Sequence, residues 1–257
     1  MEIISKAGDA LIAAAKSGVA IEPLRHEIGV TDIDQAYAIQ EYVRAVRLKS
    51  GGKIVGKKIG LTSVAVQKQL GVDQPDFGML WADTHIPNGG SVSYTDILQP
   101  KAEAELAFIL KADVPLQPTM DDVIQAIDCV KASIEVVGSR IVNWDIRITD
   151  TVADNASASH FVLGDQKVNL DEVDLTGCGM KLYVNNELRS EGSGAACLGN
   201  PLNAVLWLAN EMGRRNTPLQ AGDIILSGAL GPMVPIVAGD HILAKIDGFD
   251  DVTFSCV

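Results

Sequence analysis

Acidic side chains inside apolar segments are the residues of this sequence best placed to do chemistry. Glu103 and Glu105 lie in residues 102–110, where all the remaining residues are apolar. Residues two apart in a β-strand share a face, so these carboxylates point together to one side of a strand. Like charges this close repel unless one is protonated or a cation lies between them.

A third carboxylate, Glu135, interrupts residues 133–137, which otherwise read as an apolar strand. A buried carboxylate is costly unless it is paired or binds a metal. Three carboxylates without clustered His or Cys suit a hard cation, Mg²⁺ or Mn²⁺. The alternative places Glu103 and Glu105 on a solvated face and pairs Glu135 with Arg140. Spacing alone supports both interpretations equally.

A pair of adjacent lysines offers a possible proton carrier. Lys57 and Lys58 lie in residues 55–63, where a strand runs into a glycine turn, so one of them faces inward if the strand is half-buried. An inward lysine beside a metal site can hold a carboxylate or move a proton. The alternative is a lysine that faces solvent.

Further polar residues occupy turns. Asp76 follows Pro75 in a turn-rich stretch, where an Asp often bonds its own backbone. Ser157 can contribute a hydroxyl or cap a turn, and no G-x-S-x-G motif makes it a nucleophile. The turn at Ser227 and Gly228 can offer backbone N–H groups to an anion, although a plain tight turn explains it equally well. The four histidines lie in no ligand-like spacing.

The elements that position these residues predict a mixed α+β core rather than a doubly wound sheet, because strands outnumber helices after residue 52 without regular alternation. Residues 1–52 read as a helical segment, whose second helix Thr31 or Asp32 can cap, and residues 53–257 as the domain that carries the candidate site residues. Asn185-Asn186 predicts a hairpin turn. Strands are expected at 53–59, 103–110, 133–137, 180–184, 187–190, 224–226, 241–246 and 252–255, and helices at 63–70, 120–129 and 202–212.

Composition and charge exclude some classes of binding partner. The 257 residues carry a net charge of −12 and no basic run, which argues against a nucleic-acid partner. No signal pattern or apolar run of about 18 residues is present, so we expect a cytoplasmic protein with no membrane partner. The four cysteines are far apart and are expected to be buried free thiols.

Six ordered motifs resemble the 2-hydroxypenta-2,4-dienoate (2-oxopent-4-enoate) hydratases, a branch of the fumarylacetoacetate hydrolase-like superfamily. The resemblance covers nearly the whole chain. This sequence departs from the family pattern mainly at Lys101 and Ala102. The motifs are VGKKIGLT (55–62), GVDQPDFG (71–78), QPKAEAE (99–105), EVVGSR (135–140), DTVADNAS (150–157) and GDIILSGALG (222–231).

The resemblance implies a fumarylacetoacetate hydrolase-like fold, a β-rich sandwich or roll with a helical N-terminal segment. It implies a homo-oligomer, with a pentamer or decamer as the alternatives, that hydrates 2-hydroxypenta-2,4-dienoate with Mg²⁺ or Mn²⁺ during degradation of aromatic compounds. The implied metal ligands are Glu103, Glu105 and Glu135, the catalytic residues Lys58, Asp76 and Ser157, and the substrate-binding residues Ser227 and Gly228.

Rival functions remain open beside this one. A 4-oxalocrotonate decarboxylase or a hydratase of a dicarboxylic 2-oxo-enoate would need another cation for the second carboxylate, for which Arg140 and Arg147 are the candidates. A C–C bond hydrolase of the same fold would need a His–Glu pair, and no histidine lies in a matching motif. A non-catalytic subunit would be free to lose the acidic residues and Lys58, which this sequence keeps.

Overall fold

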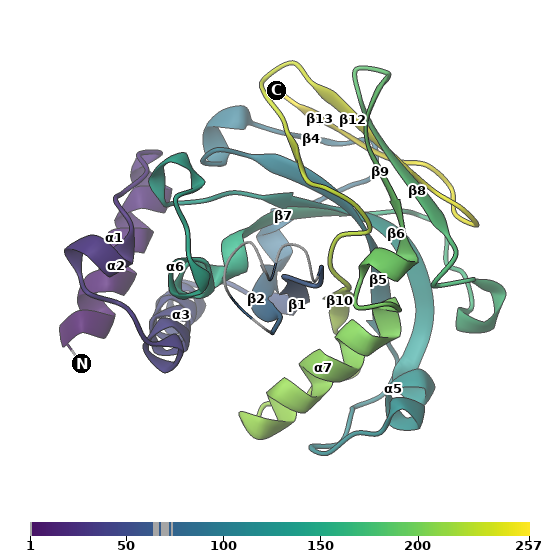
Figure 1. Ribbon diagram of the computed structural model, residues 1–257, viewed down its shortest axis with the longest axis horizontal. Coiled ribbons are helices and arrows are strands. Elements are labelled where there is room, and N and C mark those ends of the chain that lie inside the picture. The colour runs from purple at the N-terminus through teal and green to yellow at the C-terminus, as the bar shows by residue number, and fades with distance from the viewer. Residues whose placement is uncertain (1, 64–66, 68–71, 73) are drawn as a thin grey trace.

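The helices of the N-terminal segment pack at one end of the molecule (Figure 1). The computed structural model describes residues 2–63, 67, 72 and 74–257. The Asp32 side chain caps the second long helix by accepting a hydrogen bond from Asp34 N at 2.7 Å, as the sequence predicted. Apolar side chains such as Leu11 and Ile39 form a small core with residues of a later helix. The helices concerned are α1 (Glu2–Ser17), α2 (Leu24–Glu27), α3 (Ile33–Lys49) and α6 (Ile148–Ala153).

A large mixed sheet forms the centre of the protein. Its strand order is β2-β1-β10-β5-β6-β7-β3, with β11 paired to β5. The longest pairing is the antiparallel ladder between β5 and β6, in which Glu103 lies directly opposite Glu135. The strands are β1 (Ile54–Gly60), β2 (Asp76–Trp81), β3 (His85–Ile86), β5 (Lys101–Leu110), β6 (Ile127–Val137), β7 (Ala158–Leu163), β10 (Ile224–Leu226) and β11 (Val234–Pro235).

A second sheet has the order β4-β13-β12-β8-β9. Its hairpin turns at Asn185 and Asn186, whose φ angles of 52° and 67° confirm the expected turn. Together the two sheets and their helices confirm the mixed α+β class. The strands are β4 (Ser91–Val92), β8 (Gly179–Val184), β9 (Glu187–Ser193), β12 (His241–Ile246) and β13 (Val252–Cys256). Two further α-helices that the structure describes in full are α5 (Met120–Ala126) and α7 (Pro201–Arg214).

The helix expected at residues 120–129 is shorter than predicted. It ends at Ala126, because Ile127 adopts extended backbone angles and begins β6. Cys129 and Val130 then pair with β5, and both side chains are buried. Paired backbone groups and buried side chains on both faces favour the strand over another helical turn. The helix expected at residues 63–70 falls largely outside the described residues.

All four cysteines are buried free thiols, as expected. Within the described part of the chain, no helix is both long enough and apolar enough to cross a membrane. The division into residues 1–52 and 53–257 stays a prediction.

Candidate active site

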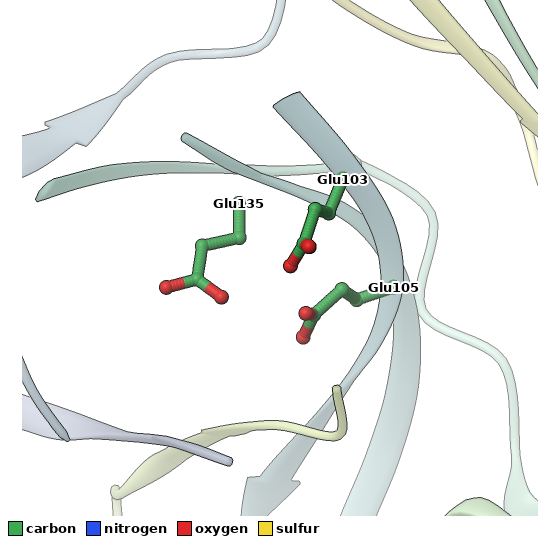
Figure 2. Close-up of side chains that lie close together, drawn as sticks. All are labelled: Glu103, Glu105 and Glu135. Carbon is green, nitrogen blue, oxygen red and sulfur yellow. The ribbon is translucent and has the colours of Figure 1, made fainter. Parts of the chain in front are cut away.

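Three glutamates from two neighbouring strands converge on one point. Figure 2 shows the side chains of Glu103 and Glu105 on β5 and of Glu135 on β6 directed toward one another. One carboxylate oxygen from each lies within 4.8 Å of the others. Glu105 and Glu135 are fully buried, whereas Glu103 keeps partial exposure. The cluster contradicts the solvated-face interpretation.

The cluster fits a divalent cation. Oε1 of Glu105 and both side-chain oxygens of Glu135 are buried and accept no hydrogen bond. The other oxygen of Glu105 accepts one from Gly228 N at 2.9 Å. Buried carboxylate oxygens without partners are costly, and a hard cation would satisfy them while balancing their charge.

Burial shifts all three carboxyl groups toward the protonated form. Burial, followed by the neighbouring Glu135 and Glu103 carboxylates, raises the pKa of Glu105 well above its usual value. Burial raises the pKa of Glu135 to about 7, although the Lys58 amine opposes the shift. The pKa of Glu103 is raised in the same way. Without a cation, the cluster therefore retains protons at pH values where carboxyl groups normally ionise.

This predicts a pH-dependent instability of the metal-free protein. A carboxyl group whose pKa is raised on folding stabilises the fold below its unfolded pKa, and that stabilisation is lost as pH rises through the folded value, about 7 for Glu135. We expect the melting temperature of the EDTA-treated protein to be lower at pH 8 than at pH 5. Glu105→Gln should raise it at pH 8 and change it little at pH 5, and saturating Mg²⁺ should reduce the pH dependence of the wild type.

Calorimetric scans at both pH values, with and without Mg²⁺, measure these effects. Glu105→Gln should also weaken Mg²⁺ binding and abolish turnover at limiting metal. If Glu105→Gln binds Mg²⁺ as tightly as the wild type, Glu105 is not a metal ligand and has only a structural role.

Lys58 is the lysine that faces the carboxylates. Its amine lies 3.3 Å from Oε2 of Glu135, which is an ion-pair distance without hydrogen-bond geometry, and donates to Ala156 O at 3.0 Å. Burial lowers the pKa of Lys58, but the surrounding carboxylates outweigh this and raise it above its ordinary value. Lys57 lies on the opposite face of β1 and pairs with Asp223 at 3.1 Å.

Asp76 begins β2 and is buried beside Lys58. It lies opposite Gly60 on β1, and a Cβ at that glycine would collide with Oδ1 of Asp76 and approach the Lys58 amine. Oδ1 of Asp76 accepts no hydrogen bond. Burial raises the pKa of Asp76, and the nearby Lys58 amine lowers it again in part. Gly60 therefore leaves the space in which the two ionisable groups meet.

Ser157 ends a tight left-handed turn that packs on β2. The φ angles of Asn155, Ala156 and Ser157 are 55°, 51° and 57°. Such angles cost about 1 kcal/mol or more at each non-glycine residue, so the surrounding contacts must hold them. The Ser157 hydroxyl lies 3.1 Å from that of Thr151 on α6, and both are buried.

The turn at Ser227 and Gly228 borders the glutamate cluster. Gly228 N donates to Glu105, and the Ser227 hydroxyl donates to the Gly228 carbonyl at 3.0 Å. The backbone N–H group that the sequence assigned to an anionic ligand therefore holds a glutamate here. The assignment of both residues to substrate binding stays a prediction.

The two arginines considered for a second carboxylate lie in different surroundings. Arg140 forms an ion pair with Asp154 through its Nε and donates to the Asp154 carbonyl at 2.6 Å, which contradicts the pairing of Arg140 with Glu135. Arg147 is exposed. The amine of Lys101, on the same face of β5 as Glu103, instead lies 4.2 Å from the centre of the Trp144 ring.

The fumarylacetoacetate (FAA) hydrolase C-terminal family model matches residues 47–255. The chain belongs to the FAA hydrolase family. This confirms the fold expected from the resemblance.

Relatives within the FAA hydrolase family are similar along most of their length. The chain is 53% identical over 251 residues to the "TodF product hydratase" of Pseudomonas putida strain F1, covering 97% of this chain and 94% of the relative. It is 51% identical to "2-keto-4-pentenoate hydratase 1" of Dechloromonas aromatica, with 95% and 93% covered. The 4-oxalocrotonate decarboxylase of Pseudomonas putida G7, complexed with magnesium and adipate, superimposes with a TM-score of 0.95 at 34% identity, covering 100% of this chain and 97% of the decarboxylase.

Proposed function

We propose that this protein is a divalent-metal-dependent hydro-lyase that hydrates 2-hydroxypenta-2,4-dienoate to 4-hydroxy-2-oxopentanoate, in the degradation of aromatic compounds. The observation that carries the proposal is the largely buried cluster of Glu103, Glu105 and Glu135 with the Lys58 amine beside it, in a chain about half identical to hydratases of this kind. The relatives' names support the substrate, and the unsatisfied carboxylate oxygens support the metal.

Glu103, Glu105 and Glu135 would hold Mg²⁺ or Mn²⁺, since all three offer hard oxygen ligands. When bound, such a cation supplies Lewis-acid stabilisation of negative charge on the substrate's 2-oxygen. Gly228 N holds Glu105, and the Lys58 amine lies beside Glu135, so the ligand set is oriented by neighbouring groups.

Lys58 and Asp76 would move the protons. The dienoate must lose the proton of its 2-hydroxyl group and gain one at C5 to become the 2-oxo-3-enoate. Water then adds its oxygen at C4, and a proton is delivered to C3. Both side chains are buried and neighbouring, and burial raises the pKa of Asp76, which favours its neutral, proton-donating form. The Ser157 hydroxyl would donate a hydrogen bond to the bound acid.

The decarboxylase of a dicarboxylic acid is the second candidate, favoured by the TM-score of 0.95. Against it, Arg140 is already paired, and identity to the hydratases is higher than the 34% shared with the decarboxylase. We also propose that the protein acts in the cytoplasm as a homo-oligomer. Its buried free thiols support a reducing compartment, and the resemblance to the hydratases supports assembly.

Substrate choice follows from the cations that face the site. We expect kcat/KM for 2-hydroxypenta-2,4-dienoate to exceed that for 4-oxalocrotonate by roughly tenfold or more. Among the residues that the structure describes, no cation is dedicated to a second carboxylate, and removing that carboxylate from water would then be costly. Metal-stripped protein resupplied with Mg²⁺, assayed on both substrates side by side, measures the ratio and tests the proposed function.

Lys101 provides the control, because its amine is the cation on the face of β5 that carries Glu103 and Glu105. Lys101→Met should leave the ratio close to that of the wild type. A preference for the dicarboxylate that disappears in Lys101→Met would assign the protein to the decarboxylases or to the hydratases of dicarboxylic acids.

A further inference from the structure

In the part of the chain that the structure describes, one side chain of the left-handed turn at residues 155–157 forms hydrogen bonds with β2. Asn155 Oδ1 accepts a hydrogen bond from Met79 N at 2.7 Å, and Asn155 Nδ2 donates to Met79 O at 3.0 Å. The carboxamide therefore uses both its acceptor and its donor on one backbone residue. An ionised carboxylate offers no donor, and a hydroxyl must donate and accept through one oxygen atom.

We propose that Asn155 is a positioning residue for the hydration reaction. Its carboxamide holds the turn against β2, so that the Ala156 carbonyl fixes the Lys58 amine and Ser157 presents its hydroxyl to the substrate. This inference rests on the proposed function.

The geometry connects Asn155 to Lys58 through two contacts. Gly78 lies directly opposite Lys58 in the pairing of β1 with β2. A Cβ at Gly78 would collide with the Asn155 carbonyl oxygen, so the turn sits directly on the strand beside the lysine. The Ala156 carbonyl then accepts the hydrogen bond from the Lys58 amine at 3.0 Å.

The side chains of Ala156 and Ser157 do not favour a left-handed backbone, so the turn depends on contacts made elsewhere. Ser157 N donates to Asp154 O at 3.0 Å, and Gly138 N donates to Ser157 O at 2.9 Å. These bonds hold the end of the turn, whereas Asn155 holds its beginning. If the carboxamide is lost, we expect the Ala156 carbonyl to move away from the Lys58 amine. The amine then keeps its ion pair with Glu135 but loses this hydrogen bond.

The Asn155→Gly variant tests whether the reaction needs the Asn155 carboxamide or only a residue that adopts a positive φ at this position. Glycine adopts a positive φ at least as readily as asparagine but lacks the carboxamide. The matched control is Asn216→Gly, which changes an exposed asparagine with φ of 56° beyond the end of α7, for which the described structure contains no side-chain hydrogen bond. A residue needed only for its backbone angle would respond to glycine in the same way at both positions.

The measurements are kcat and KM on 2-hydroxypenta-2,4-dienoate at saturating Mg²⁺, the Kd for Mn²⁺ alone, and hydrogen–deuterium exchange of peptides covering residues 76–81 and 154–158. Asn155→Gly should lower kcat about tenfold to a hundredfold, the scale expected for a misplaced reacting group, with Kd for Mn²⁺ within about twofold of the wild type. Exchange should accelerate in both peptides. Asn216→Gly should change none of these quantities.

Wild-type kcat or unchanged exchange in Asn155→Gly would overturn the inference. If that variant does not fold, Asn155→Asp takes its place: it keeps the acceptor for Met79 N and loses only the donor to Met79 O, so a wild-type kcat there would refute the inference equally. A wild-type protein without hydratase turnover would refute the proposed function instead, and the exchange comparison would still decide whether Asn155 holds the turn.

Discussion

Treatment with EDTA should abolish turnover of 2-hydroxypenta-2,4-dienoate, and Mg²⁺ or Mn²⁺ should restore it. The buried ligands are carboxylates, so the metal-free site holds repelling or protonated groups where the substrate's 2-oxygen needs positive charge. We expect a loss of roughly 10³-fold or more, since a Lewis-acidic cation contributes several kcal/mol to such a barrier. The measurement is the initial rate of dienoate consumption after chelation, dialysis and stepwise metal addition.

The control is Ca²⁺, which also prefers oxygen ligands but takes longer and less regular coordination. Mg²⁺ and Mn²⁺ should restore the rate more fully than Ca²⁺ does. Full turnover in protein shown by elemental analysis to be free of metal would refute the metal assignment.

Lys58→Met should lower kcat by about 10²- to 10⁴-fold, the usual contribution of a positioned acid or base. Methionine preserves much of the length of the side chain but carries no proton, and it leaves both Glu135 and the Ala156 carbonyl without the amine. The fold should persist when Mg²⁺ is bound, because the cation can still compensate the buried carboxylates. Steady-state rates and melting temperatures in saturating Mg²⁺ measure both effects.

Lys57→Met is the matched control, since Lys57 is the adjacent residue on the opposite face of β1 and pairs with Asp223 rather than with the cluster. It should retain kcat within a few-fold of the wild type while losing some stability. Equal losses of kcat in the two variants would indicate that the strand, and not the Lys58 amine, is what the reaction requires.

Strand periodicity predicted that Glu103 and Glu105 share one face of a strand, but spacing alone did not decide whether Glu135 joins them. The resemblance to the hydratases grouped the three glutamates. Two glutamates at spacing two and one in a neighbouring apolar strand need only an antiparallel pairing in the right register to meet. Which lysine faces them could not be deduced from periodicity, because both Lys57 and Lys58 are buried. The resemblance to the hydratases identified Lys58.

Other features depend on contacts between distant segments. The partner of Arg140 is Asp154. The sequence could not show this, because Glu135 is closer to Arg140 along the chain. The end of α5 at Ala126 follows from pairing with β5, which outweighs local helical preference. The role of Asn155 depends on the backbone of Met79, and the only local signal was that asparagine tolerates a left-handed conformation.

The pairing of β5 with β6 also determines where the chain can change in length. Side chains alternate between the two faces of a strand, so one residue inserted between Glu105 and Phe108 would turn either the glutamates or the apolar core residues beyond it to the wrong face. The connection between the strands contains α5 and residues 111–119, most of which are exposed although Val114 is buried, and an insertion among the exposed residues would leave the register of both strands intact. Natural or engineered length variation is therefore expected in residues 111–119 and not in the paired residues on either side.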